Sequence, residues 1–140
     1  MKLIWTVLMS LLGVYGQVPC AMAEMDIHTE QDVRYVTGGM TPEERKEMKK
    51  LAPRFPIHLF FAAKGHEGPV EGVNVTVRNV EGTVILKQKS QGPLFFVEVI
   101  GGRYTIDAEY DGETQSETKD LTGRRYLQLR FIFNEGPDAQ

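Results

Sequence analysis

Cysteine and histidine are scarce in this sequence of 140 residues. Cys20 is the only cysteine, and the histidines are His28, His58 and His66. A single cysteine cannot form an intramolecular disulfide, which excludes the small disulfide-stapled scaffolds. The histidines have no cysteine partners and no H-E-x-x-H spacing, so the sequence predicts neither a metal site nor a cofactor.

Motifs for catalysis are also lacking. Beyond the amino-terminal segment the serines are Ser90 and Ser116, and neither lies in a G-x-S-x-G sequence. Asp107 and Glu109 share one face of an expected strand and could form an acid–base pair, but on an outward face we expect them to be solvated. For His66-Glu67 we favour a solvated turn over a weak metal or anion site, because two adjacent ligands do not make a site. We therefore expect the protein not to be an enzyme.

An excess of basic charge is absent as well. The formal net charge is −3, from 16 basic and 19 acidic residues, and the two signs are mixed along the chain. A nucleic-acid-binding protein needs a basic footprint, and a segment that binds anionic lipid needs a polybasic run. The sequence contains neither pattern, so we expect no nucleic-acid partner.

The chain has one short hydrophobic run near its amino terminus and no long one. Leu3 to Val14 is largely apolar and follows the charged Lys2. Ala21 and Ala23 stand at the −3 and −1 positions of a signal peptidase site. The run of 12 residues is shorter than the ~17–25 that a helix needs to cross a membrane, which argues against a permanent anchor. We expect residues 1–23 to be a signal peptide cleaved after Ala23, and the protein to be periplasmic or secreted.

Cys20 suggests one alternative, in which it becomes the acylated first residue of a lipoprotein. Lipoprotein processing sites favour leucine and small residues just before the cysteine. Gln17, Val18 and Pro19 precede Cys20 here, so we favour cleavage after Ala23.

Residues 24–56 are expected to form a polar leader and one short helix, with order beginning near Val33 to Val36. Thr41 can cap the helix, Pro42 suits its first position, and Glu44 completes a capping box. The charges of the helix are mixed in sign and its apolar stripe is thin. We therefore favour a helix packed on the domain over an amphipathic helix that binds a membrane.

Residues 57–134 carry the pattern of short strands. Ile57 to Ala62 is a nearly continuous apolar run, which is typical of a strand buried on both faces. Val73 to Arg78, Tyr104 to Tyr110 and Leu127 to Phe133 alternate apolar and polar residues, which is typical of half-buried strands. No intervening run is long and helical enough for a parallel crossover. The pattern predicts a mainly β protein, a single antiparallel β-sandwich of about seven strands, similar to immunoglobulin domains.

Turn residues separate these expected strands. Asp111-Gly112 is the strongest hairpin signal, because both residues tolerate the positive φ of a type I′ turn. Gly123 marks a further turn before the last strand. We expect residues 135–140 to form a flexible tail.

Three segments of the β region carry a family pattern. They are Gly72 to Gly82, with a valine strand and a glycine turn, then Ser90 to Gly92, and then Gly101 to Gly112, with Gly-x-Tyr-x-Ile before the hairpin. Together they resemble the carboxypeptidase regulatory-like domain, a transthyretin-like (prealbumin-like) sandwich. Gly101 stands where that family has proline, and Gln91 stands where an acidic residue is common. The resemblance implies no activity, because in the family this domain accompanies the peptidase.

The mature chain as a whole also resembles small exported proteins of Gram-negative bacteria, including Tyr35 to Gly39 before the helix. That resemblance implies a periplasmic location. It does not imply a ligand.

Tyr104 and His58 each allow a structural and a functional interpretation. The alternation places Tyr104 on the core face with its hydroxyl reaching a backbone group, as in a tyrosine corner, although the ring could instead stack on a ligand. His58 shares a strand face with Phe60 and Ala62. We favour a hydrogen-bonded histidine at the core edge over a catalytic base.

Two functions from different classes are compatible with these features. We favour a noncatalytic exported β-sandwich module that presents loops or an edge strand to a protein, a peptide or a cell-envelope component. The alternative is a small transthyretin-like hydrolase. That class binds a purine-derived substrate with histidine, arginine and serine at a subunit interface and ends in a Tyr-Arg-Gly-Ser motif. This sequence ends in residues 134–140, Asn-Glu-Gly-Pro-Asp-Ala-Gln, and lacks the motif.

Overall fold

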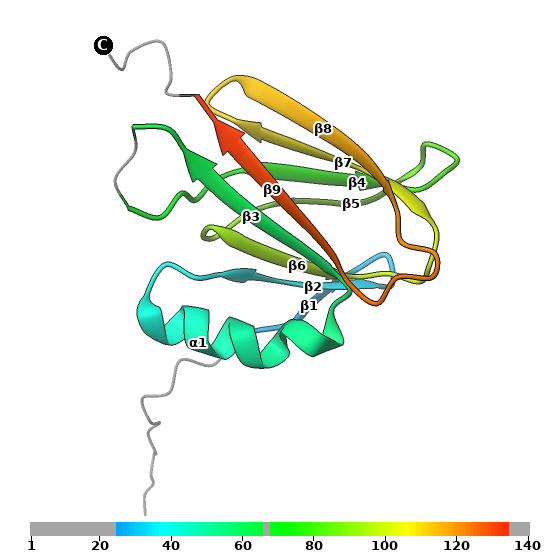
Figure 1. The fold of residues 1–140 in the computed structure, drawn as a ribbon, viewed down its shortest axis with the longest axis horizontal. Coiled ribbons are helices and arrows are strands. Elements are labelled where there is room, and N and C mark those ends of the chain that lie inside the picture. Colours follow the sequence, from blue (N-terminus) through cyan, green and yellow to red (C-terminus); the bar gives the residue numbers. More distant parts are fainter. Residues whose placement is uncertain (1–24, 66–67, 135–140) are drawn as a thin grey trace, which may run out of the picture.

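The protein is mainly β, as the sequence predicts (Figure 1). The computed structural model describes residues 25–65 and 68–134, so Ala21, Ala23, His66 and the tail at 135–140 lie outside the described residues. The described residues contain one α-helix, one 3₁₀ turn and nine strands. In chain order they are β1 (His28–Glu30), β2 (Val33–Gly38), α1 (Pro42–Leu51), η1 (Ala52–Arg54), β3 (Ile57–Ala63), β4 (Asn74–Arg78), β5 (Val84–Lys89), β6 (Leu94–Glu98), β7 (Arg103–Tyr110), β8 (Glu113–Asp120) and β9 (Leu127–Phe133).

The strands form two sheets that share one hydrophobic core. The larger sheet has the order β1-β2-β6-β3-β9, and the smaller has the order β5-β4-β7-β8. Alternate residues of β9 are buried, as are alternate residues in the first part of β7, so each strand turns one face inward. The core joins inward side chains of the larger sheet, such as Phe61 and Phe131, to those of the smaller sheet, such as Val75 and Ile106.

One strand pair differs from the expected antiparallel arrangement. β3 and β9 pair in parallel, from Ile57 opposite Leu127 to Ala63 opposite Phe133. Parallel neighbours need only a long connection between them. Here the connection runs through β4 to β8, and its described residues, 64–65 and 68–126, contain no helix. The lack of a helical crossover in the sequence therefore did not exclude a parallel pair.

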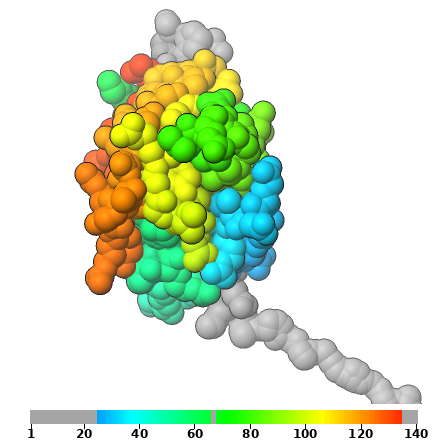
Figure 2. Space-filling model, turned by 90° about the vertical axis from the view of Figure 1, so that its right-hand side faces the viewer, coloured from blue at the N-terminus to red at the C-terminus, as the bar shows by residue number. Residues whose placement is uncertain are grey.

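The larger sheet begins within the segment that we expected to be a polar leader. β1 and β2 form a hairpin whose turn residues, Gln31 and Asp32, have φ values of 51° and 68°. The Glu30 carboxylate accepts a hydrogen bond from the Lys87 backbone N–H at 3.2 Å and another from the Gln88 side chain. These bonds join β1 to β5, the edge of the smaller sheet, and Figure 2 shows the two segments against each other in blue and green.

Side chains cap the start of α1, and Thr41 is the cap that the sequence predicts. The Thr41 hydroxyl accepts a hydrogen bond from the Glu44 backbone N–H at 3.1 Å. The Glu44 carboxylate accepts from the N–H groups of Gly39 and Met40, at 3.0 and 2.9 Å, whereas the expected capping box would place this bond at Thr41. On the other side of the helix, buried Met48 packs in a second cluster with Val36, Phe55 and Phe96. The helix is therefore packed on the outer face of the larger sheet, as expected. It is neither long nor apolar enough for a transmembrane span, and the structure describes no other helix that is.

Tyr104 and the hairpin at Asp111-Gly112 have the predicted conformations. The Tyr104 side chain is 7% exposed, and its hydroxyl donates to the Ile100 carbonyl at 2.7 Å. Asp111 and Gly112 have φ values of 53° and 85°, as a type I′ turn requires. Both results confirm the strand phase that the alternation predicted for β7.

Candidate functional site

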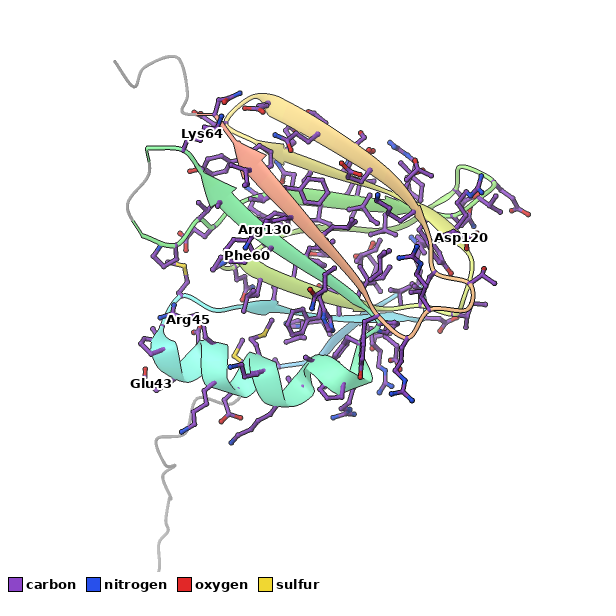
Figure 3. All side chains as sticks on the ribbon, viewed as in Figure 1. Glu43, Arg45, Phe60, Lys64, Asp120 and Arg130 are labelled. Atoms are coloured by element: carbon purple, nitrogen blue, oxygen red, sulfur yellow. The ribbon has the colours of Figure 1, made fainter. Side chains whose placement is uncertain are left out.

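A groove of about 910 Å³ lies between α1 and the outer face of the larger sheet. One wall is the helix and the floor is formed by β6, β3 and β9. In Figure 3, Arg45 lies on the helix side, while Phe60 and Arg130 lie on β3 and β9. A volume of this size is within the range of pockets that hold small ligands.

The floor of the groove consists of two rows of side chains that cross the three strands. Strand pairing places outward residues of β6, β3 and β9 opposite one another. One row is Leu94, Phe60 and Arg130, and the other is Phe96, His58 and Gln128. The floor is therefore aromatic and aliphatic at its centre, with a cation at one side.

Phe60 corrects the expectation that β3 is buried on both faces. Ile57, Leu59 and Phe61 point into the core, whereas the Phe60 side chain is 37% exposed. The reason is that α1 packs over β2 and β6 and leaves the outer face of β3 partly uncovered (Figure 1). An outward aromatic ring on this strand lines a groove instead of a second core.

His58 lies in the floor as a hydrogen-bonded histidine at the core edge, which confirms the structural interpretation. Its Nε2 is 2.9 Å from the Ala52 carbonyl oxygen, and because a carbonyl only accepts, Nε2 carries the proton. The ring also packs against Phe96 and Tyr126, at centroid distances of 4.5 and 5.5 Å. These contacts hold the ring between the helix end and the sheet.

The helix wall of the groove is cationic. Pro42, Arg45, Lys46 and Lys49 line it, and their spacing places them on one face of α1. The Arg45 guanidinium donates to the Gly39 carbonyl at 2.9 Å, which fixes the side chain beside the groove.

The acidic residues of the helix are directed elsewhere. The Glu44 carboxylate binds the backbone before the helix, and Glu47 pairs with Lys50 at 3.1 Å. Neither these two residues nor Glu43 lines the groove, and among residues 25–65 and 68–134 no carboxylate does. The helix therefore presents only basic charge to this site.

Arg130 supplies a fourth cation from the floor. Its guanidinium carbon lies 5.3 Å from the centre of the Phe60 ring, a distance typical of a cation–π contact. Among the residues that the structure describes, none of the four groove cations forms an ion pair with a carboxylate. The site thus combines an apolar floor with four basic side chains that no acidic side chain in the described part of the chain neutralises.

The residues singled out in the sequence as possible chemical groups do not gather in this groove, His58 excepted. Ser90 is buried, and its hydroxyl accepts from the Val73 N–H at 3.0 Å. Asp107 is not simply solvated, as we had expected, because it binds Arg78 and Ser116. Glu109, on the same strand face, is exposed.

His28 and Tyr104 also lie away from the groove. His28 is on β1 and stacks on Tyr35 at a centroid distance of 5.2 Å. Burial raises the pKa of Tyr104, which is consistent with a ring packed in the core. Within residues 25–65 and 68–134, no three histidine, cysteine, aspartate or glutamate side chains are grouped so that they could hold a metal ion.

Comparison with known protein families and with curated proteins finds no match to this chain.

Sequence inspection missed the groove, although part of its signal was present. Pro42, Arg45, Lys46 and Lys49 have the i, i+3, i+4, i+7 spacing of one helix face, and three of the four are basic. We interpreted the charges of the helix only as mixed in sign and its apolar stripe only as thin. That Arg130 faces the same space could not be inferred, because the parallel pairing of β3 and β9 was not anticipated.

Proposed function

We propose that this protein is a noncatalytic, exported binding module whose ligand site is the groove between α1 and the larger sheet. The observation that supports the proposal most directly is the floor of aromatic side chains beside four cations that have no acidic partner among the described residues. A concave, largely apolar site with a few placed polar groups is the usual form of a ligand site.

For the fold we propose a β-sandwich of the transthyretin-like kind. Two sheets that share a core and the hydroxyl of Tyr104 bonded to a backbone carbonyl support this assignment. The resemblance to the carboxypeptidase regulatory-like domain supports it as well. We propose a periplasmic or secreted location on the strength of the expected signal peptide at residues 1–23.

The hydrolase alternative is supported by a histidine and an arginine in the groove, but among the described residues it lacks a serine there. His58 and Arg130 both line the groove, and the hydrolase class uses histidine and arginine. Its serine has no counterpart among the lining residues, because Ser90 is buried beside Val73 and Ser116 binds Asp107. A covalent mechanism needs a nucleophile within reach of a base. The binding module is therefore the better supported function.

The proposal is tested by nuclear magnetic resonance of isotopically labelled protein mixed with an extract of the cell envelope. We expect amide shift changes at the groove, on α1 and the adjoining parts of β3 and β9. Extract depleted of small molecules by filtration is the control. Changes confined to β7 and β8, or no changes at all, would overturn the assignment of the site.

A further inference from the structure

We propose that the groove binds an amphiphile with one acidic head group, a carboxylate or a phosphate, on a linear hydrocarbon chain. This inference rests on the proposed function and names the class of ligand. Charge, hydrogen bonding and shape each contribute to it.

The charge of the lining selects an anion. Arg45, Lys46 and Lys49 face the groove from the helix, and Arg130 faces it from β9. A cationic head group would meet four like charges and no carboxylate of residues 25–65 or 68–134. A carboxylate or phosphate would accept charge-assisted hydrogen bonds from arginine and lysine, which are stronger than those between neutral groups.

The floor favours a hydrocarbon chain over a peptide. β3 is paired on one side with β6 and on the other with β9, so the centre of the floor is a sheet face and not a free strand edge. An extended peptide laid on this face would find few partners for its backbone N–H and C=O groups, which is unfavourable. A hydrocarbon chain needs none and would cover Phe60 and Leu94.

The shape favours a linear chain. His58, Phe60 and Ala62 are the outward residues of β3, and from the first to the last they span about 13 Å. A second hollow of about 340 Å³ shares Arg45 and Phe60 with the groove and includes Ala62 and Pro93 in its lining. The two together extend along β3, so we expect the head group near the helix lysines and the chain along the strand.

The test is calorimetric titration of the purified protein with four probes below their micelle concentrations. Dodecyl phosphate and dodecanoate carry the expected features. Dodecyltrimethylammonium has the same chain with a cationic head, and inorganic phosphate has an anionic head without a chain. We expect one anionic amphiphile per protein, with affinity at least about tenfold higher than that of either comparator.

A matched pair of variants locates the site. Phe60→Ser removes the ring at the centre of the floor and should weaken dodecyl phosphate binding by about tenfold. Val80→Ser removes a side chain that is 74% exposed in the loop between β4 and β5 and should change the affinity less than twofold or so. The melting temperatures of both variants check that they remain folded.

Several outcomes would overturn the inference. These are equal binding of the cationic amphiphile, equal effects of the two variants, or tighter groove binding by an acidic peptide such as polyglutamate. If no amphiphile binds but envelope extract still shifts groove amides, the ligand class is wrong and the proposed function stands. If neither binds, both fail.

Discussion

Truncation of Tyr104 is the most direct test of the core. The ring is 7% exposed and packs with inward residues of both sheets, including Ile106 and Phe95. Removal of a buried large aromatic side chain destabilises a domain by about 3–5 kcal/mol. For a chain of this size, whose free energy of unfolding is expected to be about 5–15 kcal/mol, Tyr104→Ala should therefore remove a large share of the stability.

Tyr104→Phe separates the hydroxyl from the ring. It removes only the hydrogen bond to the Ile100 carbonyl, for which we expect a loss of about 0.5–1.5 kcal/mol. The loss should fall near the lower end, because Ile100 is 83% exposed and its carbonyl can bind water once the tyrosine hydroxyl is gone.

The measurement is urea unfolding followed by far-ultraviolet circular dichroism. Tyr104→Ala should lower the urea concentration at the midpoint of unfolding and leave the dependence of the free energy of unfolding on urea concentration unchanged. Tyr126→Ala is the matched control, because that ring is 41% exposed and should cost less than about 1 kcal/mol when removed. A Tyr104→Ala variant no less stable than Tyr126→Ala would show that the Tyr104 ring is not part of the core.

Three further expectations concern the fold and export. Burial raises the pKa of Tyr104 and of Tyr35, and at Tyr35 the Glu30 charge adds to the effect. Because these tyrosines ionise at lower pH in the unfolded chain than in the folded protein, the free energy of unfolding should be unaffected below pH ~10 and should fall above it. Ultraviolet titration of phenolate absorbance checks this; normal titration of every tyrosine would count against it. Gly92→Ala should destabilise the folded protein by about 1–3 kcal/mol, because the Cβ of an alanine at this position would lie 2.3 Å from the Gly38 carbonyl oxygen. Gly101→Ala should be tolerated, because the added Cβ would lie 3.8 Å from its nearest neighbour, the Thr122 Cα. Thermal melts of the two variants check this difference. Amino-terminal sequencing of protein from the envelope fraction should find Glu24 first; a lipid-blocked Cys20 would contradict this.

Local signals in the sequence were sufficient for several elements. The Thr41 cap, the Asp111-Gly112 turn and the phase of β7 each depend on residues close in the chain, and each has the expected geometry. The β1–β2 hairpin was missed because Gln31 and Asp32 occupy its turn with positive φ, where glycine is the usual signal.

The candidate site depends on contacts between residues far apart in the chain, which the sequence pattern does not predict. Phe60 and Arg130 are 70 positions apart and meet only because β3 and β9 pair in parallel. Alternation identified Arg130 as an outward residue, but an outward position can face water or a groove. The helix that turns this face into a groove covers one part of the sheet and not the rest, and that depends on packing.

The central claim is that the groove binds an anionic ligand, and a pair of adjacent lysines tests it most directly. Lys49 lines the groove, whereas Lys50 pairs with Glu47 and does not. Lys49→Gln and Lys50→Gln change the net charge equally, so any difference between them reflects position. At about 0.15 M salt, where long-range charge effects are screened, the dissociation constant of dodecyl phosphate is measured for both. We expect Lys49→Gln to weaken binding at least about fivefold and Lys50→Gln to leave the dissociation constant within about twofold of the parent. Equal affinities for the two variants would contradict the claim.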